Sequence, residues 1–458
     1  MKYFSTRGGI EPVSFEDAVI MGQGRDGGLL LPESVPDLSG EMDAFAALGY
    51  QDLAVELLRA FTDIPDAVLR DLVSHSYATF DDPEVVPLKK LDALYILELF
   101  HGPTLAFKDL ALQFLGNLFE SILVQRGGEL NIVTATSGDT GSAAIYGARG
   151  RAAMRIFVLH PHRRVSRSQE LQMTTVLDEN VHNIAIEGTF DDCQAIVKSM
   201  FNDLEFKDAH SLGSANSINW ARVLAQVVYY VFASLRVRRE SGADRVRVAV
   251  PTGNFGNIFA GYLAVRLGAP IAKLVLATNE NDILSRFFNS GEYSLGEVHA
   301  TISPSMDIQV SSNFERYLYY VVGEDTARVS ELMEEFKRNG SIRVDPSAGG
   351  DLFVAGSGST EATLATIRDV YEKESYLLDP HSAVGVDVAG RFLDADEPMI
   401  CLATAHPAKF GEAIRDAVGD DVAHHPGLDA LSERENRMDV LPADEDAVKN
   451  FIAGKVGI

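Results

Sequence analysis

The feature that most restricts how this chain can fold is a repeated alternation between short apolar stretches and helical patterns. From about residue 95 onward, each apolar stretch is followed by a glycine-bearing turn and then by a helical pattern. Strands separated by helices pair in parallel through crossover connections, and ligands bind outside the carboxyl ends of such strands. The predicted strands include YILELF (95–100), NIVTAT (131–136), MRIFVL (154–159), HNIAIE (182–187), VRVAVP (246–251), KLVLAT (273–278), SYLLD (375–379) and MICLAT (399–404).

The two ends of the chain read differently from this α/β region. Residues 1 to about 85 are predicted to be mostly helical and to form an appended domain, with an apolar helical rhythm in DLAVELLRAF. The acidic tail from Asp420 onward is predicted to be a solvated face. A chain of 458 residues is too long for one hydrophobic core, so two or three domains are expected.

Charge and cysteine content exclude several classes of protein. The chain has 66 acidic and 40 basic residues and a net charge of −26, which repels nucleic acid and anionic membrane surfaces. The two cysteines, Cys193 and Cys401, have no metal-ligand spacing and suit a reducing compartment, so no metal site is predicted. Without an apolar run of signal-peptide or membrane-span length, the expected location is the cytoplasm.

Lys108 stands at the predicted start of a helix in HGPTLAFKD, after three apolar residues. The positive end of the helix dipole and the apolar surroundings both favour a neutral amine, which is the form that attacks an aldehyde. The alternative is a surface lysine that pairs with Asp109. Lys108 is therefore a candidate nucleophile, and the other motifs must decide between the two interpretations.

Two other strands end in turns that suit anionic groups. GNFGN (253–257) follows VRVAVP and opens a helix, so its backbone amides and the Asn254 and Asn257 side chains can cup a phosphate. The alternative is a tight turn that only needs its glycines. SGDTG (137–141) follows NIVTAT and suits a carboxylate; Ser137 as a hydrolase nucleophile is the weaker alternative, because the G-x-S-x-G elbow is absent.

Two further segments contain candidate binding residues. In NSINWAR, Ser217, Asn219 and Arg222 form a candidate phosphate site, with a structural ion pair of Arg222 as the alternative. In MICLATAHPAKF, the hydroxyl of Thr404 is expected at the ligand edge of the sheet, and Lys409 is interpreted as an ordinary loop residue.

These segments, in this order, resemble the threonine synthase family, which belongs to the pyridoxal-phosphate enzymes built like the β subunit of tryptophan synthase. The resemblance extends over nearly the whole chain, from YFSTRGG and DGGLLLPE through HGPTLAFKD, SGDTGSAA, QELQMTT, NSINWAR and GNFGN to LATAHPAKF. It implies two open, mostly parallel sheets flanked by helices (fold type II) and a mainly helical N-terminal domain. The implied domains are residues 1–90, residues 91–130 with 240–458, and residues 131–239.

The resemblance also implies a role for each candidate residue. Lys108 would hold pyridoxal 5'-phosphate as a Schiff base and shuttle protons. The remaining cofactor contacts would come from Gly253, Asn254, Phe255, Gly256, Asn257 and, at the pyridine nitrogen, Thr404. Substrate contacts would come from Ser137, Gly138, Asp139 and Thr140 at the carboxylate, and from Ser217, Asn219 and Arg222 at the phosphate.

The implied reaction converts O-phospho-L-homoserine and water to L-threonine and phosphate, by elimination of the γ-phosphate and hydration at Cβ. Two alternatives remain open at this point: another lyase of the same fold, such as a dehydratase or a cysteine synthase, and a catalytically silent relative that binds a phosphoamino acid. The expected partner is a small-molecule substrate, with no nucleic acid or membrane, and the expected state is a monomer or a homodimer.

Overall fold

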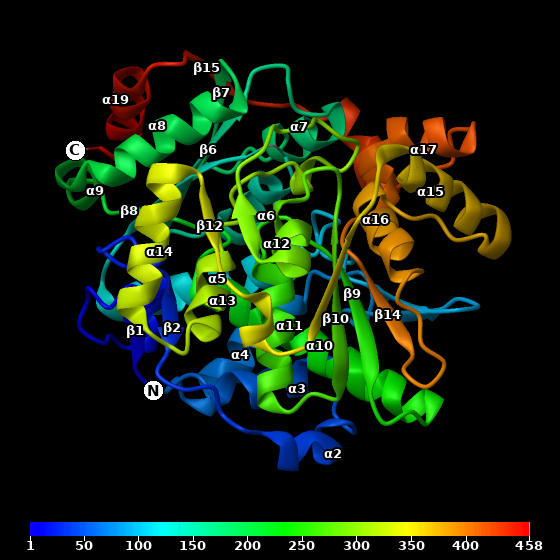
Figure 1. Ribbon diagram of the computed structural model, residues 1–458. Coiled ribbons are helices and arrows are strands. Elements are labelled where there is room, and N and C mark those ends of the chain that lie inside the picture. The colour runs from blue at the N-terminus through cyan, green and yellow to red at the C-terminus, as the bar shows by residue number, and fades with distance from the viewer. Residues whose placement is uncertain (137, 458) are drawn as a thin grey trace.

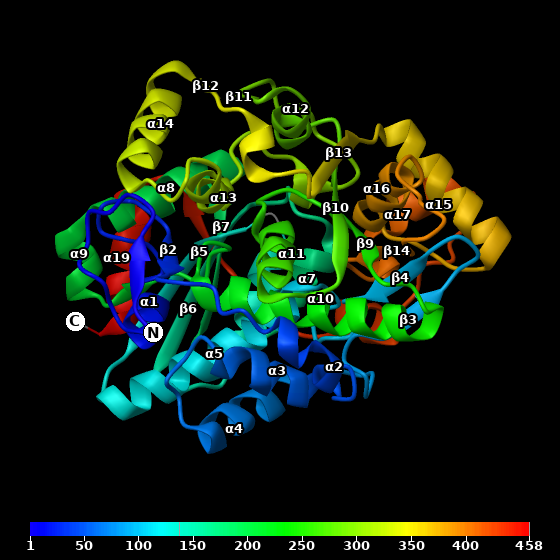
Figure 2. The same ribbon diagram turned by 60° about the horizontal axis from the view of Figure 1, so that its bottom comes forward.

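The computed structural model describes residues 1–136 and 138–457, which form two sheets flanked by helices (Figures 1 and 2). The larger sheet has the strand order β13-β10-β9-β14-β4-β3 and is parallel except for β3, which pairs with β4 antiparallel. The predicted α/β fold is therefore confirmed. The strands are β3 (Leu88–Lys90), β4 (Tyr95–Glu98), β9 (Val246–Pro251), β10 (Ile271–Thr278), β13 (Phe353–Ser357) and β14 (Met399–Ala403).

Helices cover both faces of the larger sheet, which explains why its strands are continuous apolar runs. Val248 and Val250 of β9 belong to a core cluster that they share with α5 (Lys108–Arg126), α10 (Trp220–Ser241) and α11 (Gly256–Leu267). Ala249, on the opposite face, packs in a second cluster with α16 and α17. The helices on that side are α15 (Thr360–Glu374), α16 (Pro380–Ala389) and α17 (Gly411–Val418).

The smaller sheet has the order β15-β7-β6-β5-β8 and is entirely parallel. Its strands are β5 (Leu130–Ala135), β6 (Met154–Pro161), β7 (Val181–Glu187), β8 (Leu212–Gly213) and β15 (Asp439–Pro442). One face packs on α6 (Asp139–Ala148), and the other packs on α8 (Phe190–Asn202) and α19 (Glu445–Val456). The shorter helices α7 (Arg167–Thr174) and α9 (Leu204–Ala209) complete this part of the molecule.

The N-terminal region is mainly helical, as predicted, and also contains one short hairpin-like pairing. The antiparallel strands β1 (Tyr3–Ser5) and β2 (Leu30–Pro32) lie on either side of the first helix in the sequence, and three of the four helices of this region pack against α5 or α10. In Figure 2 the third and fourth helices, at residues 50–59 and 66–77, lie beneath α5 and α10. The four helices of the region are α1 (Phe15–Met21), α2 (Met42–Phe45), α3 (Tyr50–Arg59) and α4 (Asp66–Tyr77). None of the helices in the described ranges is long and apolar enough to cross a membrane.

An excursion between β10 and β13 adds a small subassembly above the larger sheet (Figure 2). Its antiparallel strands β11 (Glu292–Ser294) and β12 (Ser341–Arg343) pair with each other. Aromatic side chains of this excursion, including Phe287, Phe288, Phe314 and Tyr317, surround Phe255 or its neighbours. The helices are α12 (Ile283–Ser290), α13 (Phe314–Val321) and α14 (Thr326–Asn339).

Two sequence predictions about the C-terminal third are wrong. The segment 375–379 is not a strand, because Asp379 caps α16 by accepting hydrogen bonds from the backbone N–H groups of His381 and Ser382, and Pro380 occupies the first helical position. The acidic tail is not merely a solvated face. It forms α18 (Pro426–Asp429), β15 and α19, and Val448 and Ile452 are fully buried.

The tail also departs from the predicted domain division. The predicted larger domain includes residues 439–442, but β15 pairs with β7 of the smaller sheet. An apolar face of α19 packs against α8, and this contact holds the C-terminal residues against the smaller sheet. The other predicted boundaries stay predictions.

Helices α5 and α6 touch at two glycines. A Cβ on Gly116 would lie 1.9 Å from the carbonyl oxygen of Gly147, and a Cβ on Gly147 would lie 2.5 Å from the carbonyl oxygen of Leu112. Since both neighbours are backbone atoms, neither can move aside as a flexible side chain would. This contact fixes α5, which begins with Lys108, against α6, which begins with Asp139.

Gly116→Ala is expected to lower the free energy of unfolding by about 1–3 kcal/mol, because the helices must separate to admit a methyl group. The measurement is the urea midpoint of the purified protein. Gly454→Ala is the matched control, since Gly454 lies in α19 and a Cβ there meets open space. That variant should be unchanged or slightly more stable; an equal loss in both variants would contradict the contact.

Candidate active site

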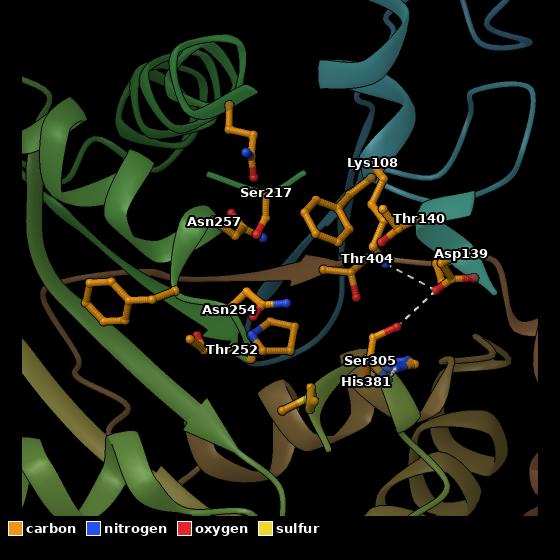
Figure 3. Close-up of a pocket in the computed structure, with 18 of the residues that line it drawn as sticks. Lys108, Asp139, Thr140, Ser217, Thr252, Asn254, Asn257, Ser305, His381 and Thr404 are labelled. Carbon is orange, nitrogen blue, oxygen red and sulfur yellow. Dashed lines mark hydrogen bonds and ion pairs between the residues drawn. The ribbon is translucent and has the colours of Figure 1, made fainter. Parts of the chain in front are cut away.

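A cavity lies where the carboxyl ends of strands from both sheets face each other (Figure 3). Segments that follow β5, β9 and β14 reach it, as does the start of α5. Ligand sites at strand ends are the rule for open parallel sheets. The residues that line it are Phe107, Lys108, Asp139, Thr140, Ser217, Arg222, Gln226, Pro251, Thr252, Gly253, Asn254, Phe255, Gly256, Asn257, Ser305, Met306, His381, Thr404 and Ala405.

Lys108 is buried in this cavity and is not a surface lysine. Its Nζ lies 3.3 Å from Asp139 Oδ2. Asp109 instead accepts hydrogen bonds from the backbone N–H and the hydroxyl of Thr104, at 2.8 and 2.6 Å. Burial lowers the pKa of Lys108; the nearby Asp139 raises it, and the cations of Lys409 and Arg222 lower it further. The local electrostatics therefore favour a neutral amine.

The segment 253–257 forms the opposite side of the cavity (Figure 3). Phe255 has a left-handed backbone conformation, φ 61°, and its ring is buried, so the chain turns sharply before α11 begins at Gly256. Asn257 Oδ1 accepts hydrogen bonds from the hydroxyls of Tyr229 and Tyr230, at 2.6 and 2.7 Å. Its buried Nδ2 donor has no partner among the described residues. A helix N-terminus with an unused amide donor is suited to a phosphate.

Thr404 follows β14 and lies near the centre of the cavity (Figure 3). Its backbone N–H donates to Ser382 Oγ at 3.0 Å, and its carbonyl accepts from the N–H of Phe107 at 2.8 Å. Both backbone groups are thus engaged, and the side-chain hydroxyl is left as the polar group that Thr404 offers to a ligand.

The turn before α6 is only partly as predicted. Asp139 and Thr140 line the cavity, whereas the N–H of Gly138 is already bound to Thr136 Oγ1 at 2.9 Å. Gly138 has φ 143°, and a Cβ there would lie 2.4 Å from Gln169 Cδ, so this position requires glycine. Ser137 lies outside the described residues.

The carboxylate of Asp139 is saturated with protein contacts. It accepts from Gln169 Nε2 at 2.8 Å and Ser305 Oγ at 3.3 Å, and it pairs with the ammonium groups of Lys108 and Lys409. Burial raises its pKa, but Lys409 and Lys108 outweigh burial and hold the pKa well below its ordinary value. Asp139 is therefore an ionised structural centre of the site.

The candidate phosphate residues separate into two groups. Ser217 and Arg222 line the cavity. Asn219 does not: it caps α10 by accepting from the N–H of Ala221 at 3.1 Å and donates through Nδ2 to the carbonyl of Val19 at 2.8 Å. Both ends of its side chain already contact the protein, and the predicted substrate contact of Asn219 stays a prediction.

Arg222 is a buried cation without a carboxylate partner in the part of the chain that the structure describes. Its Nη1 donates to the carbonyl of Ala215 at 2.8 Å, and its buried Nε has no hydrogen-bond partner there. Burial lowers the pKa of Arg222 to about 10. The predicted alternative of a structural ion pair is thus not found, and a cavity-facing cation of this kind suits an anionic ligand.

The sequence patterns do not identify five polar residues at the site: Gln226, Thr252, Ser305, His381 and Lys409. The interpretation of Lys409 as an ordinary loop residue is wrong, because its side chain is fully buried against Asp139. The N–H of Ser305 donates to His381 Nε2 at 3.2 Å, while His381 Nδ1 contacts Asp379 Oδ1 at 2.9 Å. Of these residues, Lys409 could have been predicted from the sequence, because it closely follows the apolar strand 399–403 and Thr404.

The arrangement fits a phosphorylated aldehyde held by a lysine. The unused Asn257 amide and the start of α11 suit its phosphate, and the buried amine of Lys108 suits its carbonyl carbon. Residues 83–358 match the family model described as a pyridoxal-phosphate dependent enzyme. Fold and site together thus define a pyridoxal-phosphate enzyme of fold type II.

Comparison with known proteins narrows the class. Residues 2–77 match the model of the threonine synthase N terminus, and residues 382–452 match that of its C-terminal part. The chain is 46% identical to threonine synthase of Schizosaccharomyces pombe, over 98% of this chain and 93% of that protein. It is also 46% identical to the enzyme of Pseudomonas aeruginosa, over 99% and 98%.

Among solved structures, the crystal structure of pyridoxal-phosphate-bound threonine synthase from Brucella melitensis matches with a TM-score of 0.96 and 46% identity, over the full length of both chains. The chain therefore belongs to the threonine synthase family. It is a lyase of amino-acid biosynthesis that uses pyridoxal phosphate. This favours threonine synthase over a dehydratase or cysteine synthase and over a catalytically silent relative.

Proposed function

We propose that this chain converts O-phospho-L-homoserine and water to L-threonine and inorganic phosphate, and that the residues of the cavity bind the cofactor and the substrate. Its membership of the threonine synthase family supports the reaction. The observation that carries the residue assignment is the buried guanidinium of Arg222, which faces the same cavity as Lys108 and has no carboxylate partner among the described residues. One cavity then offers two sites for phosphate groups: Arg222 and the start of α11.

The cofactor is assigned to Lys108, residues 253–257 and Thr404. When bound, pyridoxal phosphate withdraws electrons from an amino acid joined to it and so acidifies the Cα–H bond. The amides at the start of α11 and Asn257 Nδ2 bind the phosphate group. The hydroxyl of Thr404, being neutral, can hydrogen-bond the ring nitrogen without enforcing its protonation, which restrains transamination.

The substrate is assigned to the remaining polar groups that line the same cavity. Thr140 and the backbone at the start of α6 bind its carboxylate, since the side chain of Asp139 is committed to two lysines. Ser217 and Arg222 bind its phosphate. Ser217 Oγ contacts Ser312 Oγ at 3.0 Å, which orients it beside the Asn254 side chain.

Lys108 Nζ is the group placed to move protons. Burial and the neighbouring cations lower its pKa, so the amine can be neutral when a proton must be accepted. We assign it the removal of the proton at Cα of the substrate and the later transfers at Cβ. Phe107, Pro251 and Met306 in the lining limit the access of bulk water to these atoms.

The substrate test compares O-phosphohomoserine with O-phosphoserine, which is one methylene shorter. Phosphate release from O-phosphohomoserine should be faster by at least about tenfold, because a lost methylene and a displaced phosphate together cost about 1–3 kcal/mol. Free phosphate and threonine are measured from the same reaction. Equal rates on both compounds, or an oxo acid in place of threonine, would contradict the proposal.

We also propose that the enzyme works in the cytoplasm, as a monomer or a homodimer, without a nucleic-acid partner. The net charge of −26 supports the last point, because it repels phosphate backbones at long range. The proposed domains are the N-terminal region, a cofactor domain around the larger sheet, and a substrate domain around the smaller sheet that includes β15.

A further inference from the structure

Two ammonium groups bind the carboxylate of Asp139, and only one of them can stay charged throughout turnover. Lys108 Nζ lies 3.3 Å from Oδ2 and Lys409 Nζ lies 2.9 Å from Oδ1. Lys108 must be a neutral amine to attack a carbonyl carbon or to accept a proton. At those stages its charge no longer balances Asp139, whose side chain is only 3% exposed. A buried carboxylate without a counter-ion is costly.

Lys409 is built into the site as a fixed charge. It lies in the short 3-10 turn Pro407–Phe410, and its side chain is 0% exposed. Besides Asp139, its Nζ binds the carbonyl of Thr104 at 2.7 Å, four residues before Lys108. Its own carbonyl accepts from Ser168 Oγ of α7 at 3.2 Å. Lys409 thus ties together the segment before α5, the start of α6, and α7.

We propose that Lys409 is a positioning residue that neutralises Asp139 permanently, so that Lys108 can lose its proton without leaving an unbalanced buried carboxylate. This inference rests on the proposed assignment of Lys108 as the covalent partner of the cofactor. Lys409 acts through Asp139 and Lys108, and no contact with substrate is needed. Gln169 and Ser305 hold the carboxylate in place but supply no charge.

Three charged groups act on Lys108: Asp139 favours its protonated form, whereas the cations Lys409 and Arg222 oppose it. After burial, which lowers the pKa of Lys108, the next influences are Asp139, which raises it, and Lys409, which lowers it. Removing Lys409 alone should therefore keep the proton on Lys108. Removing Asp139 alone should release it, and removing both should nearly cancel. This reciprocal pattern is a property of charge balance and does not follow from a loss of packing.

The test uses apoprotein mixed with pyridoxal phosphate, and it follows the rate of Schiff-base formation by absorbance as a function of pH. For Lys409→Met, the midpoint should move up by about one pH unit or more, and for Asp139→Asn it should move down by a similar amount. The double variant should lie close to the unmodified protein. Lys373→Met, at a side chain that is 72% exposed, is the matched control and should not change the midpoint.

Two results would overturn the proposal: an unchanged midpoint in Lys409→Met, or a double variant displaced as far as Lys409→Met. If Lys409→Met fails to fold, as judged by circular dichroism, Asp139→Asn decides, and an unchanged midpoint in it would count against the idea. Failure of the underlying assignment looks different. In that case Lys108→Ala would still form a borohydride-reducible adduct, whatever the Lys409 variants do.

Discussion

Lys108→Ala is expected to lower the rate of phosphate release from O-phosphohomoserine by about 10⁴-fold or more. The substitution removes both the covalent attachment of the cofactor and the amine that we assign to the proton transfers at Cα and Cβ. The variant should still fold, because Asp139, the ion-pair partner of Lys108, keeps its pairing with Lys409. Initial rates of phosphate release, at saturating cofactor, measure the effect.

Covalent labelling and rescue by an added amine test the same role of Lys108 independently of the rate of phosphate release. Borohydride reduction of the unmodified protein should fix the cofactor on the peptide that contains Lys108, and an exogenous primary amine should restore part of the activity of Lys108→Ala. Label on a different lysine, Lys409 included, would show that the assignment is wrong. A colourless protein that ignores added pyridoxal phosphate would contradict the cofactor site itself.

Arg222→Met is expected to lower kcat/KM for O-phosphohomoserine by about 100-fold, which corresponds to about 2.7 kcal/mol of lost transition-state binding. The same change should raise the melting temperature of the ligand-free protein, because it removes a buried cation whose Nε has no partner in the described chain. Activity and stability therefore move in opposite directions. Rate assays and thermal unfolding of the same preparations measure both.

The matched control for Arg222 is Arg415→Met, at an arginine in α17 whose side chain is 56% exposed. It should change neither kinetics nor melting temperature. The affinity for pyridoxal phosphate shows whether Arg222 binds the phosphate of the substrate or that of the cofactor. If Arg222→Met weakens cofactor binding and leaves the substrate KM unchanged, the guanidinium belongs to the cofactor phosphate, and our assignment to the substrate is incorrect.

The sequence predicted the central strands well because burial on both faces leaves an unmistakable apolar run. VRVAVP coincides with β9, and the runs at 273–278 and 399–404 lie within two residues of β10 and β14. It failed at SYLLD, where Leu377 and Leu378 fill a core position without belonging to a sheet, and the Asp379-Pro380 helix start was overlooked. A short apolar run does not by itself distinguish a strand from a buried connection.

The parts of the candidate site that are formed by the backbone could be predicted from the sequence. Glycines and helix starts place residues 253–257 and Lys108, and these features are local in sequence. The contacts of long side chains were not predictable. Nothing near Asn219 indicates that it binds the carbonyl of Val19, 200 residues earlier. Likewise, the pairing of Lys409 with Asp139 depends on how the two sheets face each other, which no local pattern encodes.

The pairing of β15 with β7 has a consequence for how the protein is made. The edge of β7 acquires its neighbour only when residues 439–442 have been synthesised, although β7 itself ends at Glu187. At roughly 5–20 residues per second, the nascent chain carries an open strand edge on the order of ten seconds or longer. An exposed edge of this kind invites pairing with other chains. Strand β15 thus closes the edge of a sheet whose other four strands all lie before residue 214.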